Sequence, residues 1–196
     1  VAGLLNSLTP IWTLIIGIII FKLQFIKQKL IGVILGFFGA ASLIILGSED
    51  ILGGNPFFGI FIIVATICYA SSVNMVQAFF SDTKPIIISS MSFFLIGPPA
   101  WIYLLMSDFR INLQTNPLAW QALGAVTILS LFGTVLASIL FYYLVQKTSA
   151  IFGSTVTYLM PIVAMIWGFI DGETISILHF TGMAMILAGV YITKKN

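Results

Sequence analysis

Charged residues are scarce in this sequence. Its 196 residues include eight lysines and arginines and six aspartates and glutamates, 7% in all, whereas soluble domains have about 25%. Because 60% of the residues are hydrophobic, a soluble fold could not bury enough of them. The scarcity of charge excludes a soluble globular domain. It predicts an integral membrane protein, embedded in a lipid bilayer, whose units are helices of about 20 apolar residues.

Other groups that carry chemistry are also rare or missing. The chain has one cysteine, Cys68, so no disulfide forms within it, and one histidine, His179, which is interpreted as an interfacial residue. It has no spacing typical of metal ligands, no nucleophile with a base partner and no glycine-rich phosphate loop. We therefore expect no enzyme, no cofactor and no metal site. The net charge of +2, carried by scattered residues, argues against a nucleic-acid partner.

Long apolar runs alternate with polar or Pro/Gly breaks along the chain. They predict an all-α integral membrane fold, a multi-span helical bundle with seven transmembrane helices. Two of these helices begin next to a proline, at Asn55–Pro56 and Lys84–Pro85, where the first helical turn tolerates that residue. The predicted helices cover residues 1–21, 30–47, 56–80, 86–106, 120–146, 149–170 and 176–193.

The basic residues lie almost entirely on one side of this predicted bundle. Seven consecutive spans place successive loops on alternate sides, and one side then holds only Arg110. The positive-inside rule makes the lysine-rich side cytoplasmic, so we expect the C-terminus in the cytoplasm. The lysines on that side are Lys22, Lys27, Lys29, Lys84, Lys147, Lys194 and Lys195.

Two segments that contain a proline resemble each other. NSLTPIWTLIIG at 6–17 aligns without gaps with TYLMPIVAMIWG at 157–168. The match continues into the next helix of each, where one residue of gap aligns two pairs of glycines. Two consecutive helices are therefore predicted to be duplicated. The matched pairs are Leu8 with Leu159, Pro10 with Pro161, Ile11 with Ile162, Ile15 with Ile166, Gly17 with Gly168, Gly32 with Gly182, and Gly39 with Gly189.

The duplication predicts repeats of five helices. Pro161 lies in the fourth of the five helices that follow Glu49–Asp50. An odd number of helices turns the second copy upside down in the bilayer, and inverted repeats are typical of transporters. Residues 1–48 would be the last two helices of a first repeat, and 55–196 a complete second repeat. Because the chain starts at Val1 without a basic leader, we expect a piece of a longer protein with three more helices upstream.

The run GSTVTYLMPIVAMIWGFIDGE at 153–173, with the glycine-containing segment after it, resembles the C-terminal half of EamA-like proteins of the drug/metabolite transporter superfamily. In that family the proline-bearing helix ends in a Gly-Glu pair. Gly172–Glu173 match this pair in the second repeat, whereas Phe21–Lys22 stand in its place in the first repeat. ATICYASSVNM at 65–75 is similar to the opening helix of the same repeat, with Tyr69 where tryptophan is usual. The resemblance implies the last seven helices of a 5+5 inverted-repeat protein, and we expect it in a bacterial cytoplasmic membrane.

The two matched prolines interrupt helical hydrogen bonding. A proline inside a helix cannot donate to the carbonyl four residues earlier, so the carbonyls of Asn6 and Thr157 lose their partners. In hydrocarbon such a break is tolerated only where side chains, protein backbone or water satisfy the freed group. We interpret Pro10 and Pro161 as hinges of two bent helices that face a central cavity. The alternative is a kink kept for close packing.

Uncharged polar side chains supply the candidate solute contacts. Along 120–146, hydroxyl residues lie within about 60° of a common direction, although small hydroxyl residues also pack membrane helices together. Along 56–80, Asn74 is the strongest candidate because an amide is costlier to bury than a hydroxyl. The hydroxyl row is Thr127, Ser130, Thr134, Ser138 and Tyr142, and the polar side of 56–80 is Thr66, Tyr69, Asn74 and Gln77. The predicted substrate-binding residues are Asn6, Thr13, Tyr69, Asn74, Thr134, Ser138, Tyr142 and Thr157.

Small residues four apart predict close helix contacts. Gly32, Gly36 and Ala40 form one such row, and Ala184 and Ala188 form a shorter one. We interpret both as packing faces, either within one protomer or across a homodimer.

These features favour a secondary transporter that moves a small neutral or zwitterionic metabolite, amino-acid or drug-like, by alternating access. No charged residue falls near the middle of a predicted span, so no proton- or ion-coupling site is visible. The alternatives are a membrane scaffold or assembly subunit that transports nothing, whose polar rows are only helix contacts, and an inactive truncation.

Overall fold

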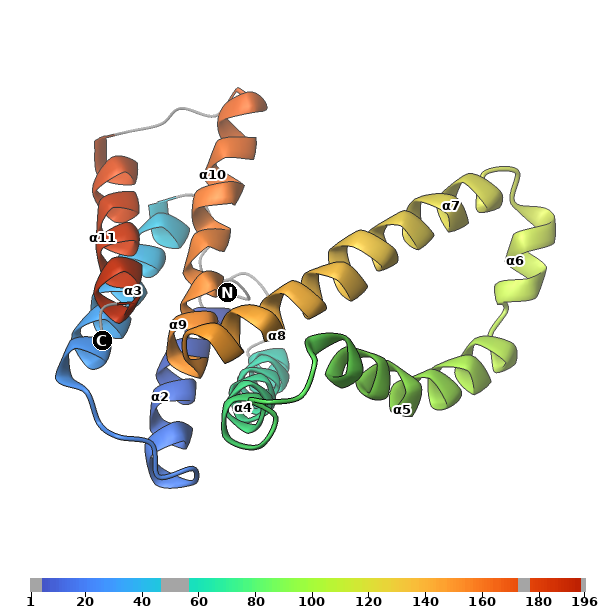
Figure 1. Ribbon diagram of the computed structural model, residues 1–196. Coiled ribbons are helices and arrows are strands. Elements are labelled where there is room, and N and C mark those ends of the chain that lie inside the picture. The colour runs from blue at the N-terminus through green and yellow to red at the C-terminus, as the bar shows by residue number, and fades with distance from the viewer. Residues whose placement is uncertain (1–4, 47–56, 173–176, 195–196) are drawn as a thin grey trace. The chain divides into compact units, whose positions relative to one another are not determined.

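The computed structural model describes residues 5–46, 57–172 and 177–194, and every regular element in these ranges is helical (Figure 1). A π-helix, η1, joins α7 to α8, and a 3₁₀-helix, η2, joins α9 to α10. The elements are α2 Thr9–Ile19, α3 Lys27–Leu46, α4 Phe57–Phe79, α5 Pro85–Met106, α6 Phe109–Thr115, α7 Ala119–Leu129, η1 Ser130–Leu136, α8 Ala137–Lys147, α9 Ala150–Ser154, η2 Thr155–Leu159, α10 Met160–Ile170 and α11 Ile177–Lys194.

Six helical segments of the described chain are long and apolar enough to cross a membrane. Each corresponds to a predicted span, and the largest difference between helix ends is at the start of α3, predicted at residue 30 and found at Lys27. The seventh predicted span, 1–21, contains the shorter apolar helix α2. The protein is therefore an all-α integral membrane bundle. The six segments are Lys27–Ile45, Gly59–Phe79, Pro85–Met106, Ala119–Lys147, Ala150–Ile170 and Ile177–Lys194.

Local signals at two helix ends can be compared with the structure. Helix α5 starts at Pro85 after Lys84, as predicted, because proline lacks the N–H that the first turn leaves unpaired. The expected start at Asn55–Pro56 and the residue Glu173 lie outside the described residues. Helix α6 was not predicted, because seven residues are too few to show a hydrophobic period.

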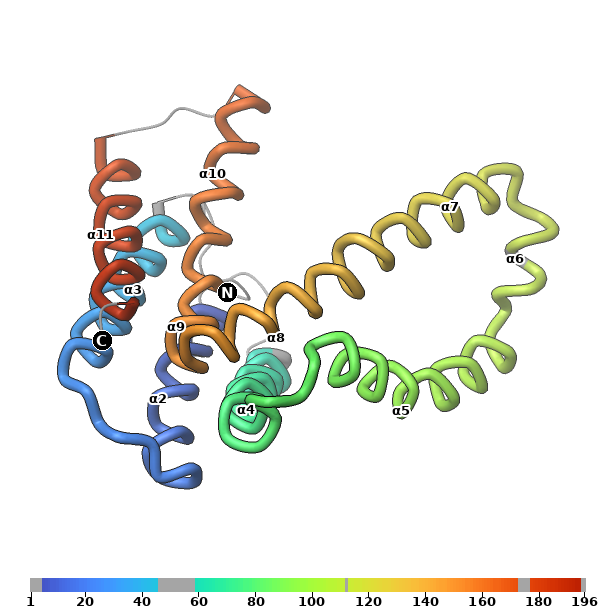
Figure 2. Tube along the Cα trace, in the orientation of Figure 1, coloured from blue at the N-terminus to red at the C-terminus, as the bar shows by residue number. Residues whose placement is uncertain are grey.

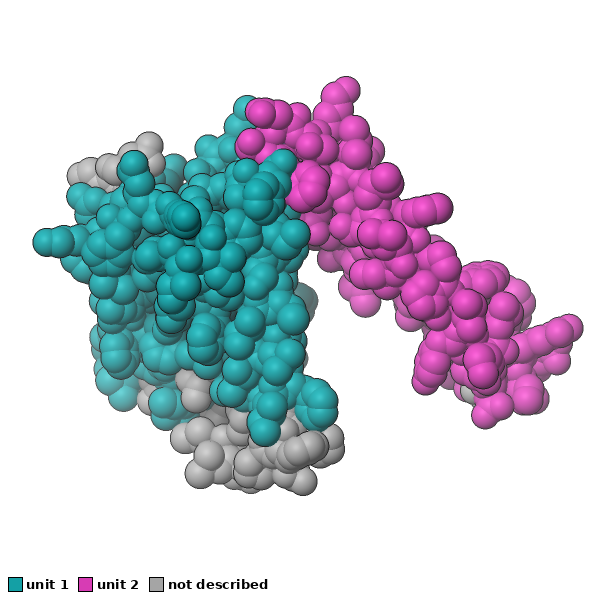
Figure 3. Space-filling model, turned by 90° about the horizontal axis from the view of Figure 1, so that it is seen from below, with its two compact units in different colours: residues 1–79, 145–196 teal, residues 80–144 magenta. Residues whose placement is uncertain are grey.

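The chain forms two compact units, coloured separately in Figure 3. Unit 1 comprises residues 1–79 and 145–196, and unit 2 comprises residues 80–144. Two small clusters of buried side chains lie among the described residues of unit 1. The first joins α3, η2 and α11 through Ala40, Leu43, Tyr158 and Ile186. The second joins α2, α3 and α9 through Leu14, Val33 and Ile151.

Glycines bring α3 and α11 of unit 1 into backbone contact as an antiparallel pair (Figure 2). A β-carbon added to Gly32 would lie 2.6 Å from the carbonyl oxygen of Gly189, and one added to Gly189 would lie 2.6 Å from that of Gly32. A β-carbon on Gly39 would lie 2.8 Å from the carbonyl oxygen of Gly182. Small residues let membrane helices approach closely. Any residue larger than glycine would push these two helices apart.

The predicted packing rows behave differently from each other. Gly32 and Gly36 are buried and Ala40 is fully buried, so this row packs within one chain. Gly36 lies under the ring of Tyr158, whose Cδ2 would be 2.6 Å from an added β-carbon. Ala184 and Ala188 are instead exposed. The face of α11 that contacts α3 is formed by its glycines rather than by these alanines.

Unit 2 contains α5, α6, α7, η1 and most of α8. Among the described residues of α5, α7 and η1, Ser89 is the only buried one. Large apolar side chains are otherwise exposed, for example Met106 at 83% and Tyr103 at 77%. Soluble proteins rarely expose a continuous apolar surface of this kind to water. Lipid chains are as apolar as leucine, so the surface agrees with membrane-spanning helices.

Candidate functional site

Pro10 is the second residue of α2 rather than a residue in the middle of a helix. Its ring leaves the carbonyl of Asn6 without a backbone donor, and the hydroxyl of Thr9 donates to that carbonyl at 2.8 Å. Helical bonding resumes at once, because the N–H of Trp12 donates to the carbonyl of Leu8 at 3.0 Å. A side chain next to the proline therefore satisfies the freed group, one of the solutions expected in hydrocarbon.

Pro161 occupies the same position in α10, the second residue. Here the chain arrives through the 3₁₀ turn Thr155–Leu159, and the N–H of Met160 donates to the carbonyl of Thr157. The tighter i→i+3 bonding of a 3₁₀ turn supplies the donor that proline lacks. Both prolines thus lie at helix restarts, where the first turn tolerates them. Neither proline interrupts a run of α-helical hydrogen bonds, because α2 begins one residue before Pro10 and, within the helical segment 150–170, the 3₁₀ turn comes directly before the α-helix of Pro161.

Asn74 of α4 connects two of the candidate residues. Its amide nitrogen donates to the carbonyl of Thr13 on α2 at 3.0 Å and to that of Ala70 on its own helix at 2.9 Å. The side chain is fully buried, and its Oδ1 has no hydrogen-bond partner among the described residues. That oxygen lies against Gly17, where an added β-carbon would be 2.8 Å away. The amide therefore spans one turn of α2, from Thr13 to Gly17.

The other predicted contacts of unit 1 differ in exposure. Thr13 is fully buried, and its hydroxyl donates to the carbonyl of Thr9 at 2.9 Å. Thr157 is half-buried and its hydroxyl donates to the carbonyl of Ser154 at 2.8 Å. Asn6 is exposed, and Tyr69 is 41% exposed although Thr66 and Asn74 on the same helix are buried. The structure brings together Thr13 and Asn74, but Tyr69 does not share their buried face.

Three predicted contacts, Thr134, Ser138 and Tyr142, lie on the helical segment 119–147 of the chain. Its middle is the π-helix η1, where the N–H of Ala137 donates to the carbonyl of Phe132, five residues earlier. Before it, the hydroxyl of Thr127 donates to the carbonyl of Leu123 at 2.8 Å. The hydroxyls of Ser130, Thr134 and Ser138 have no hydrogen-bond partner within the part of the chain that the structure describes. They remain available to donate and accept.

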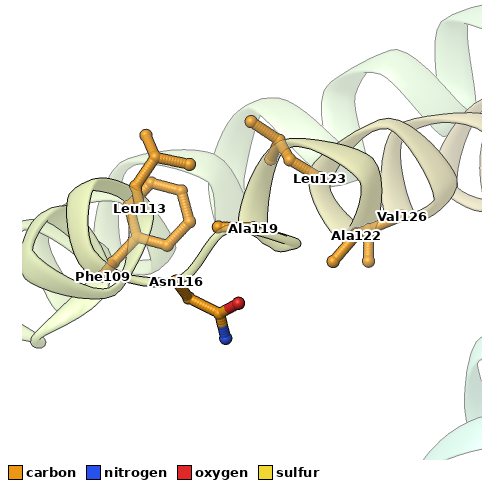
Figure 4. Close-up of a pocket in the computed structure, with 7 residues that line it drawn as sticks. All are labelled: Phe109, Leu113, Asn116, Ala119, Ala122, Leu123 and Val126. Atoms are coloured by element: carbon orange, nitrogen blue, oxygen red, sulfur yellow. The ribbon is translucent and has the colours of Figure 1, made fainter.

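An open pocket of about 250 Å³ lies in unit 2 between α6 and α7 (Figure 4). Its walls are apolar except for Asn116, whose Oδ1 accepts from the N–H of Leu118 at 2.9 Å. None of the predicted substrate-binding residues lines it. The residues that line it are Phe109, Leu113, Asn116, Ala119, Ala122, Leu123 and Val126.

A family model described as the EamA-like transporter family matches residues 57–194, more than half of the chain. The chain belongs to the EamA-like transporter family. The resemblance inferred from the proline segment and its flanking residues is thereby confirmed. As an EamA-like protein with six apolar spanning segments, the chain is an integral membrane protein of a transporter family.

Several curated proteins are similar to this EamA-like chain. It is 25% identical over 198 residues to an uncharacterized transporter of Archaeoglobus fulgidus, covering 100% of this chain and 68% of that protein. It is 31% identical to the uncharacterized transporter YetK of Bacillus subtilis, covering 98% and 58%. It is 23% identical to the uncharacterized inner membrane transporter YedA of Escherichia coli K12, covering 98% and 60%. The chain thus spans between 58% and 68% of these relatives. No solved structure matches it.

Three contacts of the EamA-like chain were not predicted. Tyr158 is fully buried, and its hydroxyl donates to the carbonyl of Val33 on α3 at 3.0 Å. Gln77 of α4 accepts from the N–H of Ala150, at the start of α9, while Ser149 caps the same end by accepting from Phe152 at 3.2 Å. Ser149 before an apolar run is a recognisable N-cap signal. For Tyr158 no local signal exists, because its partner lies 125 residues away.

Proposed function

We propose that this chain is the C-terminal part of a secondary transporter that moves a small neutral or zwitterionic metabolite by alternating access. The family and the relatives named as transporters support transport itself. We place the protein in the bacterial cytoplasmic membrane with its C-terminus inside, supported by the one-sided distribution of lysines and by the inner-membrane name of YedA.

The observation that carries the proposed mechanism is the crossed glycine contact between α3 and α11. In the sequence match Gly32 corresponds to Gly182 and Gly39 to Gly189, but in space Gly32 meets Gly189 and Gly39 meets Gly182. A two-fold axis between duplicated helices produces this pattern, because it exchanges the two contacts. A two-fold relation between antiparallel copies of the duplicated helices supports repeats of inverted topology. In our proposal one repeat rocks against the other during transport.

The solute class follows from the polar groups that remain available. The free hydroxyls of Ser130, Thr134 and Ser138 suit hydrogen bonds with an uncharged group. No acidic or basic residue of the sequence lies near the middle of a spanning segment, so a net charge on the solute would have no partner there. These two features favour a neutral or zwitterionic solute.

A transport assay on hydroxyl-deleted variants tests the proposal. In full-length protein reconstituted into proteoliposomes, Thr134→Val, Ser138→Ala and Tyr142→Phe together remove three hydroxyls and nearly preserve side-chain shape. We expect the uptake rate of radiolabelled neutral amino acids to fall at least tenfold, the effect of about 1.4 kcal/mol. Ser90→Ala, at an exposed hydroxyl on α5, is the matched control and should leave uptake unchanged. Equal uptake by the triple variant and the parent would contradict the proposed solute contacts.

A further inference from the structure

The two matched proline helices are covered to different extents. In α2, Pro10, Thr13 and Gly17 are all buried. No residue of α10 is buried: Pro161 and Gly168 are half-buried, and Ala164 is exposed. The sequence match makes Pro161, Ala164 and Gly168 the counterparts of the three buried residues of α2. We call these three residues the α10 face.

On α2 the corresponding face is covered by α4. The amide of Asn74 bonds the backbone carbonyl of Thr13 and its oxygen lies against the bare α-carbon of Gly17. This contact needs only a backbone carbonyl, a residue without a side chain one turn later, and no bulky group between them. It does not use the hydroxyl of Thr13, which donates within α2.

The α10 face offers the same groups at the same spacing. Ala164 supplies a backbone carbonyl with only a methyl side chain, and Gly168, four residues later, has none. Both residues follow a proline at the second position of the helix, as Thr13 and Gly17 do. A helix with a suitably placed amide would therefore find on α10 the surface that Asn74 finds on α2.

We propose that the α10 face binds another membrane helix that carries an asparagine at the place equivalent to Asn74, its amide donating to the carbonyl of Ala164 and its oxygen resting on Gly168. This rests on the two-repeat plan of the proposed function. Helix α4 opens the second repeat, so the occupant is the opening helix of the first repeat. The relatives have room for it, since this chain spans 58% to 68% of their length.

A second copy of this chain does not offer the required group. Both protons of the Asn74 amide are already used, one by Thr13 and one by Ala70 of the same chain. The crossed glycine contact gives the same assignment. The two-fold axis that exchanges the contacts Gly32–Gly189 and Gly39–Gly182 would also carry the α2–α4 pair onto α10 and the opening helix.

A peptide with the sequence of residues 57–80 serves as the probe. The 196-residue chain is placed in nanodiscs with an acceptor dye on its single, exposed cysteine, Cys68, and the peptide, with Cys68→Ser, carries the donor. We expect energy transfer between them. Gly168→Leu in the chain should weaken association at least tenfold, and Asn74→Leu in the peptide about threefold to tenfold, the range of interhelical hydrogen bonds in membranes. Gly124→Leu, where no atom lies within 4 Å of an added β-carbon, should change nothing.

Three results would overturn the proposal. The first is equal binding of the peptide to the parent and to the Gly168→Leu chain. The second is equal binding of the Asn74→Leu peptide, which would remove the amide from the contact. The third is association between two chains that Gly168→Leu abolishes while the peptide does not bind, which would assign the face to a second copy. No transport is measured, so these results are separate from the uptake assay of the proposed function.

Discussion

Two helix pairs of unit 1 both depend on glycine, but in different ways. Between α3 and α11, glycine meets the backbone of the other helix, as Gly32 does with Gly189. Between α2 and α4, one glycine, Gly17, meets the tip of a side chain, the amide of Asn74. A backbone cannot move without its helix, whereas an amide can turn. The first contact is therefore fixed by shape, and the second is adjustable and polar.

The largest effect is expected where backbone meets backbone. Gly189→Ala would place a β-carbon 2.6 Å from the carbonyl oxygen of Gly32 and from the N of Gly36, so α3 and α11 must separate. We expect a loss of about 3 kcal/mol in the free energy of unfolding, at the upper end for overpacking. Denaturation of the reconstituted chain by SDS, followed by circular dichroism, measures it.

Gly124→Ala is the control for this variant, because an added β-carbon there meets nothing within 4 Å. Both variants replace a helical glycine by alanine. The gain in intrinsic helix propensity is therefore the same in both and cancels when their stabilities are compared. Equal stability of the two variants would show that the glycine contact of α3 and α11 is not close in the membrane.

A smaller effect is expected at Gly17. The β-carbon of Gly17→Ala would lie 2.8 Å from Oδ1 of Asn74, and rotation of the amide can relieve part of the overlap. We expect a loss of about 1 to 2 kcal/mol. A double-mutant cycle sharpens the comparison. In an Asn74→Ala background, Gly17→Ala should lower the free energy of unfolding clearly less than it does in the parent. Additive losses would contradict direct contact between Gly17 and Asn74.

Removal of the Asn74 amide should lower the free energy of unfolding by less still. Asn74→Ala deletes the hydrogen bonds to the carbonyls of Thr13 and Ala70, but helical N–H groups still reach such carbonyls. Interhelical hydrogen bonds in membranes average about 0.6 kcal/mol, so we expect a loss near 1 kcal/mol in the same unfolding assay. Ser72→Ala, at an exposed hydroxyl of α4, is its control. A loss as large as that of Gly189→Ala would erase the distinction between the two helix pairs.

The smallest effect is expected at the start of α2. Thr9→Val keeps the shape of the side chain but removes the hydroxyl that donates to the carbonyl of Asn6. The change removes one hydrogen bond and leaves the packing of α2 in place, so the loss in the free energy of unfolding should stay below about 1 kcal/mol. Faster hydrogen exchange at the first turn of α2, with unchanged exchange in α3, would be the matching signature. Unchanged exchange in α2 would show that the hydroxyl does not hold this turn.

The sequence was most informative where one physical requirement dominates. Six spanning segments were predicted closely because hydrocarbon demands uninterrupted apolar runs of fixed length. The start of α5 at Pro85 was predictable from the chemistry of proline alone. Asn74 was singled out as a solute contact because an amide is costly to bury, and that role stays a prediction; in the structure its amide donates to the carbonyls of Thr13 and Ala70.

Features that depend on distant residues or on small differences in backbone energy were not predicted. The contact of Tyr158 with Val33 joins residues 125 apart. The π-helix η1 and the 3₁₀ turn η2 use the same residue types as an α-helix, and hydrophobic periodicity does not distinguish them over five to seven residues. Tyr69 was placed on one polar side of α4 with Asn74, but five residues separate the two, which is not a helical repeat, and Tyr69 is 41% exposed while Asn74 is buried.

The π-helix also changes how the hydroxyl row should be drawn. A π turn accommodates one residue more than an α turn, so everything after η1 lags by about 100° on a helical wheel. Counted this way, Ser138 and Tyr142 each come within about 20° of the direction of Ser130, and the sector holding the row narrows from about 120° to about 80°. The irregular turn straightens the line of hydroxyls along the helix instead of scattering it.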